Sequence, residues 1–143
     1  MMDDTKISNT KISILFYSSF MFITNVLAAL IQEYYIYSLL FANLTITSVM
    51  FHTNNTIYTN ILDKIAILAV VFYGGGVLYN KINAHNIGYV SIIVLSFLLC
   101  NILYFYGYYN KKYCYDPNKK IGDQFHCWLH IISSFGHHFI TFL

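Results

Sequence analysis

The sequence predicts an all-α bundle of transmembrane helices, and three features of the chain lead to that prediction. Hydrophobic residues make up 57% of it and charged residues only 10%, whereas soluble domains carry about 25% charged residues. The apolar residues gather into stretches close to the roughly 20 residues that one helix needs to cross a bilayer. Tyrosines concentrate near the ends of these stretches, as they do at membrane–water interfaces.

Five apolar stretches follow one another, separated by short polar segments. Each is expected to form a helix, because a helix satisfies its own backbone hydrogen bonds in lipid. The expected spans run from about Ile12 to Ile31, Tyr34 to Phe51, Ile61 to Tyr79, Ile87 to Tyr106 and Phe125 to Leu143. A glycine triplet, 74–76, inside the third span indicates close helix packing or a local kink. Residues 1–143 are therefore predicted to form a single transmembrane domain.

The basic residues predict how the bundle is oriented. All eight are lysines, and with five spans the N-terminal segment, a 52–62 loop and a 107–123 loop share one side of the membrane. That side holds seven of them, namely Lys6, Lys11, Lys64, Lys111, Lys112, Lys119 and Lys120. The opposite side holds only Lys81. The positive-inside rule therefore predicts a cytosolic N-terminus and a C-terminus that is outside or lumenal.

Composition also argues against two other classes of protein. The net charge is only +2 and the chain has no arginine, so the basic stripe typical of a nucleic-acid-binding protein is missing. The three cysteines, Cys100, Cys114 and Cys127, are odd in number and irregularly spaced. They do not indicate the disulfide framework of a small secreted domain.

Polar residues within or beside the spans are costly in lipid, so they are the first candidates for a functional site. The second span ends in Ser48-x-x-x-His52, the third begins near Asp63, and the fifth begins with His126-Cys-Trp-Leu-His130. In each four-residue spacing the two side chains share one helix face. With five spans, all five side chains are expected on the same side of the membrane, at one depth just inside its cytosolic surface.

This convergence predicts a zinc site formed by His52, His126 and His130. Three neutral imidazoles would leave a fourth position open for a water molecule, as in catalytic zinc sites, and zinc would lower the pKa of that water to about 7. Asp63 could hold and deprotonate the water, and Ser48 could donate a hydrogen bond to it or to an oxyanion. Taken singly, these residues have simpler interpretations: interfacial histidines, a helix-starting aspartate and a small packing serine.

His137 and His138 need a separate interpretation. His137 follows His126 by eleven residues, about 16 Å along a helix, which is too far to bind the same ion. It is expected to line a cavity or to lie at the far interface.

The pattern Ser48-x-x-x-His52, Asp63 and His126-x-x-x-His130 resembles the CREST superfamily of membrane hydrolases. That group includes alkaline ceramidases, Per1-like proteins and adiponectin-receptor-like proteins. The resemblance implies that the three histidines bind zinc and that the aspartate and serine assist a zinc-bound water. The family has seven spans, so this chain would be a reduced member. It also lacks the acidic, tryptophan-containing N-terminal segment with which alkaline ceramidases bind calcium.

The favoured function is a zinc-dependent hydrolase that cleaves amide or ester bonds of a membrane lipid. The substrate would be a ceramide-like or other acyl lipid. If self-association completes the reduced bundle, the protein would form a homo-oligomer. One alternative is a non-enzymatic scaffold, fusion factor or receptor-like protein with a structural metal site. A metal or proton transporter is a further alternative, although the third and fourth spans carry no charge between Lys64 and Lys81 or between His85 and Lys111.

Overall fold

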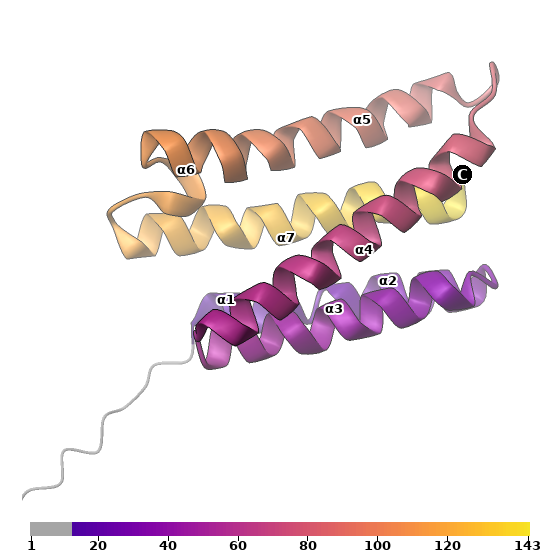
Figure 1. Ribbon diagram of the computed structural model, residues 1–143. Helices are drawn as coiled ribbons and strands as arrows, with labels where there is room; N and C mark the ends of the chain where they lie inside the picture. Colours follow the sequence, from indigo (N-terminus) through magenta and orange to yellow (C-terminus); the bar gives the residue numbers. More distant parts are fainter. Residues whose placement is uncertain (1–12) are drawn as a thin grey trace, which may run out of the picture.

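The computed structural model describes residues 13–143, which form a bundle of helices without a β-strand (Figure 1). Sequence predictions that concern Lys6, Lys11 and the start of the first span at Ile12 lie outside the described residues. The elements are α1 (Ile14–Ser19), α2 (Phe22–Ile31), α3 (Tyr35–Thr53), α4 (Ile57–Lys81), α5 (Ile87–Asn101), the π-helix η1 (Ile102–Tyr106), α6 (Gly107–Asn110), the 3-10 turn η2 (Tyr113–Tyr115) and α7 (Lys119–Phe142).

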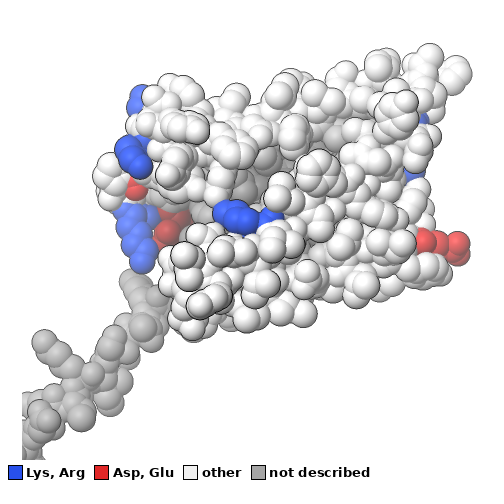
Figure 2. Space-filling view, viewed as in Figure 1, with Lys and Arg blue, Asp and Glu red and all other residues white. Residues whose placement is uncertain are grey.

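Four helical segments are long and apolar enough to cross a bilayer: Ile14–Ile31, Tyr35–Thr53, Ile57–Lys81 and Ile87–Tyr115. They confirm the expected fold class, an all-α bundle of a membrane protein. The fifth long helix, α7, has 24 residues but is less apolar, because histidines, serines and threonines interrupt its apolar residues. Figure 2 agrees with lipid as the surrounding solvent, since charged side chains gather mainly at the two ends and the lateral surface visible there lacks them except for basic atoms midway along it.

The long segments run alternately up and down the bundle (Figure 1). The start of α1, the turn between α3 and α4 and the α6–η2 segment lie at one end, which we call the α6 end. The turn before α3, the turn before α5 and the C-terminus lie at the other, which we call the C-terminal end. The alternation expected from five apolar stretches is therefore present.

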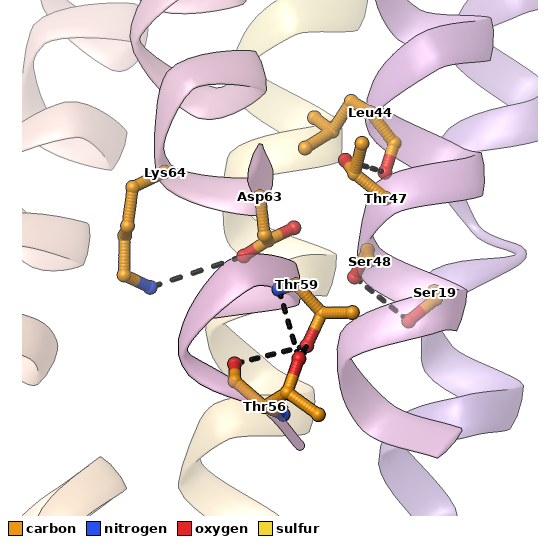
Figure 3. Close-up of polar contacts among 8 residues, drawn as sticks. All are labelled: Ser19, Leu44, Thr47, Ser48, Thr56, Thr59, Asp63 and Lys64. Carbon is orange, nitrogen blue, oxygen red and sulfur yellow. Dashed lines mark hydrogen bonds and ion pairs between the residues drawn. The ribbon is translucent and has the colours of Figure 1, made fainter. Parts of the chain in front are cut away.

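Two predicted loops are largely helical instead. Only residues 54–56 connect α3 to α4, because a reciprocal cap starts α4 early. The Thr56 hydroxyl accepts from the Thr59 N–H at 3.2 Å, and the Thr59 hydroxyl accepts from the Thr56 N–H at 3.0 Å (Figure 3). Such a capping box satisfies backbone donors that the first turn of a helix leaves free. The predicted 107–123 loop likewise contains α6, η2 and the first turn of α7.

The first span also departs from a continuous helix. It is interrupted between α1 and α2 at Phe20 and Met21. The hydroxyls of Ser18 and Ser19, in the last turn of α1, both donate to the Leu15 carbonyl oxygen, at 3.1 and 2.9 Å. Serine side chains that bond back to their own helix in this way often bend it. The interruption matters for function because it lies beside the histidines described below.

α7 lies inside the bundle, between α5 on one side and α1, α2 and α3 on the other (Figure 1). Four of its polar residues follow one another at spacings of three or four and share one helix face. They are His130, Ser134, His137 and Thr141. Three of these side chains bond to other helices, which explains how a polar face can be buried in a protein surrounded by lipid.

The partners of that face come from α1, α2 and α3. Ser18 is 2.8 Å from His130 Nδ1. The Asn25 amide donates to the Ser134 carbonyl at 2.9 Å, and its oxygen accepts from the Ser134 hydroxyl at 2.5 Å. Tyr37 hydrogen-bonds to His137 Nδ1. His137 thus packs against α3 inside the bundle.

Lys81 closes the C-terminal end. Its ammonium donates to the carbonyl oxygens of Ile140 and Thr141 at 3.0 and 3.2 Å and lies 4.7 Å from the centre of the Tyr34 ring. Cations at a helix C-terminus satisfy its free carbonyls and interact favourably with its dipole. Lys81, the one lysine predicted on the C-terminal side of the membrane, is therefore bound to the end of α7.

In the glycine triplet 74–76, only Gly74 lies at a close contact between helices. A Cβ atom on Gly74 would collide with the Tyr37 hydroxyl and would come within 3.2 Å of the His137 ring, whereas Gly75 and Gly76 face open space. Close packing, one of the two interpretations of the triplet, is confirmed at Gly74, and α4 runs unbroken through it.

Gly74→Ala is expected to lower the free energy of unfolding by about 1–3 kcal/mol, the usual cost of overpacking a buried contact. Gly75→Ala is the matched control, because it adds the same methyl group to open space. Thermal unfolding in detergent would compare the two variants. Equal stability of both would show that α3, α4 and α7 are not packed as described.

Candidate metal centre

Three histidines from two helices meet near the α6 end of the bundle. His52 lies in the last turn of α3, and His126 and His130 lie one turn apart on α7. One ring nitrogen of each lies within 4.8 Å of one from each of the others. The ring centres are 5.0 Å apart for His126 and His130, 5.1 Å for His52 and His126, and 5.4 Å for His52 and His130. The structure thus brings together the three residues that the sequence predicted.

The arrangement is close to what a tetrahedral ion requires. Zinc–nitrogen bonds of about 2.0–2.1 Å place two imidazole nitrogens about 3.4 Å apart, so small ring rotations would close the cluster around an ion. Cys127 and Trp128 lie between the two α7 histidines in sequence. They are not part of the cluster, and Trp128 is 57% exposed on the outside of the helix.

Ser18 occupies one nitrogen of His130, since its hydroxyl oxygen is 2.8 Å from Nδ1, so Nε2 is the nitrogen that remains for an ion. The Ser18 hydroxyl also lies 3.1 Å from the Leu15 carbonyl oxygen, which can only accept a hydrogen bond. When the hydroxyl proton is on that carbonyl, Ser18 accepts from Nδ1–H and Nε2 carries the lone pair. Partners of this kind fix the tautomer and orientation of metal-binding histidines.

Ser48 takes part in a second hydroxyl pair. Its oxygen is 2.9 Å from that of Ser19 (Figure 3), and the Ser19 hydroxyl is itself directed to the Leu15 carbonyl at 2.9 Å. When the Ser19 proton is on that carbonyl, Ser48 is the donor to Ser19 and offers lone pairs to its other neighbours. The predicted role as a donor to a substrate oxygen requires its hydroxyl to turn away from Ser19 and stays a prediction.

Asp63 is buried within α4. It lies in the second turn of the extended helix, rather than at its start as the sequence suggested, and only 4% of its surface is exposed. Its Oδ2 is 3.8 Å from the Lys64 ammonium, and its Oδ1 has no hydrogen-bond donor among the described residues. Figure 3 shows the carboxylate and the Ser48 hydroxyl at a similar height along neighbouring helices. A buried carboxylate oxygen without a donor is costly, so it is suited to hold a proton donor such as water.

A cavity of about 340 Å³ lies against two of the histidines. Its wall is formed by α3, α4, the η1–η2 region and the start of α7. The residues that line it are Ser13, Leu15, Phe51, His52, Asn55, Asn60, Lys64, Tyr104, Cys114, Tyr115, Lys119, Asp123 and His126. The volume lies within the range of small-ligand sites, about 300–1,000 Å³.

The sequence did not reveal three of the polar residues around the histidines. Ser18 and Ser19 lie in an apolar stretch and read as ordinary small residues, and Lys64 was counted only for membrane orientation. A weak signal was nevertheless present, because two adjacent serines interrupt the first span and polar groups in spans are rarely without a partner.

Comparisons with protein-family models, curated proteins and solved structures found no match to this chain. The resemblance to the CREST superfamily therefore rests on the spacing of the motif residues.

Ser18→Ala is expected to weaken zinc binding by about 10- to 100-fold, the usual cost of removing a group that orients a metal-binding histidine. Ser133→Ala is the matched control, because Ser133 bonds to the His130 carbonyl and not to its ring. Titration of the purified protein with zinc against a competing chelator would measure both affinities. Similar affinities for the two variants would show that Ser18 does not orient the His130 ring for an ion.

Proposed function

We propose that the protein is a zinc-dependent hydrolase that cleaves an amide or ester bond of a membrane lipid. The observation that carries the proposal is the cluster of three imidazoles at one end of a helical bundle suited to lipid. The buried carboxylate of Asp63, in the second turn of α4, lies toward the same end of the bundle. Three neutral nitrogen donors are typical of catalytic zinc, in which a fourth position stays open.

The residues present fit a zinc ion. His52, His126 and His130 would hold it, with Nε2 of His130 presented by the bond to Ser18. When bound, the ion would supply a Lewis acid that polarises the carbonyl and activates water. Borderline-soft imidazole donors favour zinc over calcium and magnesium, which prefer oxygen ligands.

Asp63 is the proposed general base. Its Oδ1, which lacks a donor, would accept a hydrogen bond from the attacking water and then take its proton. As the bond between the acyl carbon and the leaving group breaks, Asp63 would return that proton to the leaving amine or alkoxide. The products would be a fatty acid and the remainder of the lipid.

A lipid substrate is supported by the apolar surroundings. A groove of about 400 Å³ lies between α5 and α7, and Ile131, which follows His130 in the sequence, is one of its lining residues. Its other lining residues are Ile92, Leu95, Ser96, Leu99, Ile132 and Phe135. Such a surface suits an acyl chain that enters sideways from the bilayer.

The distribution of lysines supports a cytosolic location for the site. Lys111, Lys112, Lys119 and Lys120 lie in or beside the α6–η2 segment, at the same end of the bundle as the histidines. Lys81, at the other end, is bound to the carbonyls of α7. The positive-inside rule then places the α6 end in the cytosol and the C-terminus outside or in a lumen.

A non-enzymatic membrane protein with a structural metal site is the second candidate. One observation favours it: both groups proposed to assist the water have partners within the protein, since Ser48 bonds to Ser19 and Asp63 lies 3.8 Å from Lys64. Ser48 would have to turn away from Ser19 before it could assist a reaction, whereas Asp63 Oδ1 has no donor to leave.

The protein purified in detergent is expected to bind one zinc ion, to lose it in His126→Ala and to release fatty acid from an acyl amide or acyl ester lipid. Metal analysis and measurement of free fatty acid would test both expectations. His85→Ala is the control, because His85 is exposed in the turn before α5. Well-folded protein that binds no zinc would end the proposal.

Asp63→Asn separates the two candidates. It keeps the size of the side chain but removes the base, so hydrolysis is expected to fall by about 100-fold or more while zinc binding stays unchanged. An unaltered rate would remove Asp63 from the reaction. A cellular effect of the protein that survives the loss of hydrolysis would favour the structural role.

A glycosylation acceptor fused after Leu143 is expected to be modified in microsomal membranes, whereas the same acceptor fused before Met1 is not. The unfused chain is the control, because its own acceptor sequences at Asn43 and Asn54 lie within α3 and beside its end and should stay unmodified. A shift in electrophoretic mobility would report the modification. Modification of the N-terminal fusion alone would show that the protein has the opposite orientation.

A further inference from the structure

The cavity beside the histidines contains a lysine whose position has not yet been explained. Lys64 lies in the second turn of α4, a helix long enough to cross the bilayer, and it lines the cavity together with His52 and His126. Charged side chains within membrane helices are rare because lipid does not solvate them, and they are commonly functional.

Two aromatic rings of the cavity wall hold the lysine. Its ammonium lies 4.8 Å from the centre of the Tyr104 ring and 5.7 Å from that of the Phe51 ring. Both distances allow cation–π attraction, which is strongest where water is excluded. These two contacts keep the charge at the cavity, where a ligand could reach it, and the side chain is 36% exposed.

The ammonium has unused hydrogen-bonding capacity. Its one anionic neighbour among the described residues is Asp63 Oδ2, at 3.8 Å, which is too long for a hydrogen bond. A lysine carries three N–H donors, and the aromatic rings accept none of them as an oxygen would. The group is therefore able to donate to an oxygen atom of a bound molecule.

The charge of the whole cavity favours an anion. Lys64 and Lys119 both line it, and Asp123, the one carboxylate of the lining, has its Oδ2 3.4 Å from the Ser13 hydroxyl. Two lysines against one aspartate leave the lining with a net charge of +1, while Asp63, the carboxylate 3.8 Å from Lys64, does not line the cavity. Charges in a partly enclosed, low-dielectric cavity act more strongly than in water.

We propose that this cavity binds the anionic headgroup of a lipid and that Lys64 donates a hydrogen bond to its phosphate oxygen. The substrate of the proposed hydrolase is then an anionic acyl lipid rather than a neutral, ceramide-like one. Only the identity of the substrate rests on the proposed function, since headgroup binding itself requires neither zinc nor hydrolysis.

The test is lipid binding to metal-free protein. The full chain, purified in a neutral detergent with a chelator, is offered dioleoyl phosphatidic acid or dioleoylglycerol, which share their acyl chains and differ in the phosphate. Native mass spectrometry measures the bound fraction of each. Phosphatidic acid is expected to bind at least about tenfold more tightly, as one charge-assisted hydrogen bond would give.

Lys64→Gln is expected to remove that preference, and Lys64→Arg, which retains the charge, to keep it. Lys111→Gln is the matched control, because Lys111 also lies over a tyrosine, 5.0 Å from the Tyr108 ring, but does not line the cavity. Equal binding of the two lipids by the natural sequence, or a preference unchanged in a folded Lys64→Gln variant, would overturn the inference. If inorganic phosphate binds as tightly as phosphatidic acid, the ligand of the cavity is a soluble phosphate and the inference of a lipid headgroup is overturned.

These outcomes are separable from those of the proposed function. A preference for phosphatidic acid without any fatty-acid release would uphold the headgroup site and count against the hydrolase. Zinc-dependent hydrolysis of neutral and anionic lipids at equal rates would uphold the hydrolase and overturn the assignment of an anionic substrate.

Discussion

The bundle depends on burying the polar face of α7. In lipid, an imidazole, hydroxyl or amide without a partner has no water to replace the lost hydrogen bond, so this face must find its partners on other helices. Ser18, Asn25 and Tyr37 supply them from three successive segments of the chain. These contacts fix α7 in the interior, and the same placement brings His126 and His130 next to His52. Packing and the histidine cluster therefore have one cause.

Much of this arrangement could be predicted because it follows from length and parity. Five apolar stretches joined by short connections must alternate in direction, and alternation puts the end of α3 and the start of α7 at the same end of the bundle. The spacing His126-x-x-x-His130 then defines one helix face. The convergence of three imidazoles needed no knowledge of side-chain packing.

Other features could not be predicted, because they depend on contacts that are distant in sequence. Whether α4 begins at Ile61 or at Ile57 depends on the threonine cap, which is a local signal that the search for apolar stretches passed over. The bonds from Ser18 to His130 and from Ser19 to Ser48 depend on how the short helix α1 packs against α3 and α7. Hydroxyls in an apolar stretch do not indicate which distant residue they will contact, and neither does the imidazole of His137.

Trp128 is a natural fluorescent probe of one position in the protein. It is the single tryptophan, it lies between the two α7 histidines in sequence, and it is exposed on the opposite side of that helix. All indole emission of the folded protein consequently originates from the outer surface of one turn. A lipid that carries bromine atoms at a chosen carbon would quench this emission according to its distance, so the depth of that turn below the headgroups can be measured without adding a label.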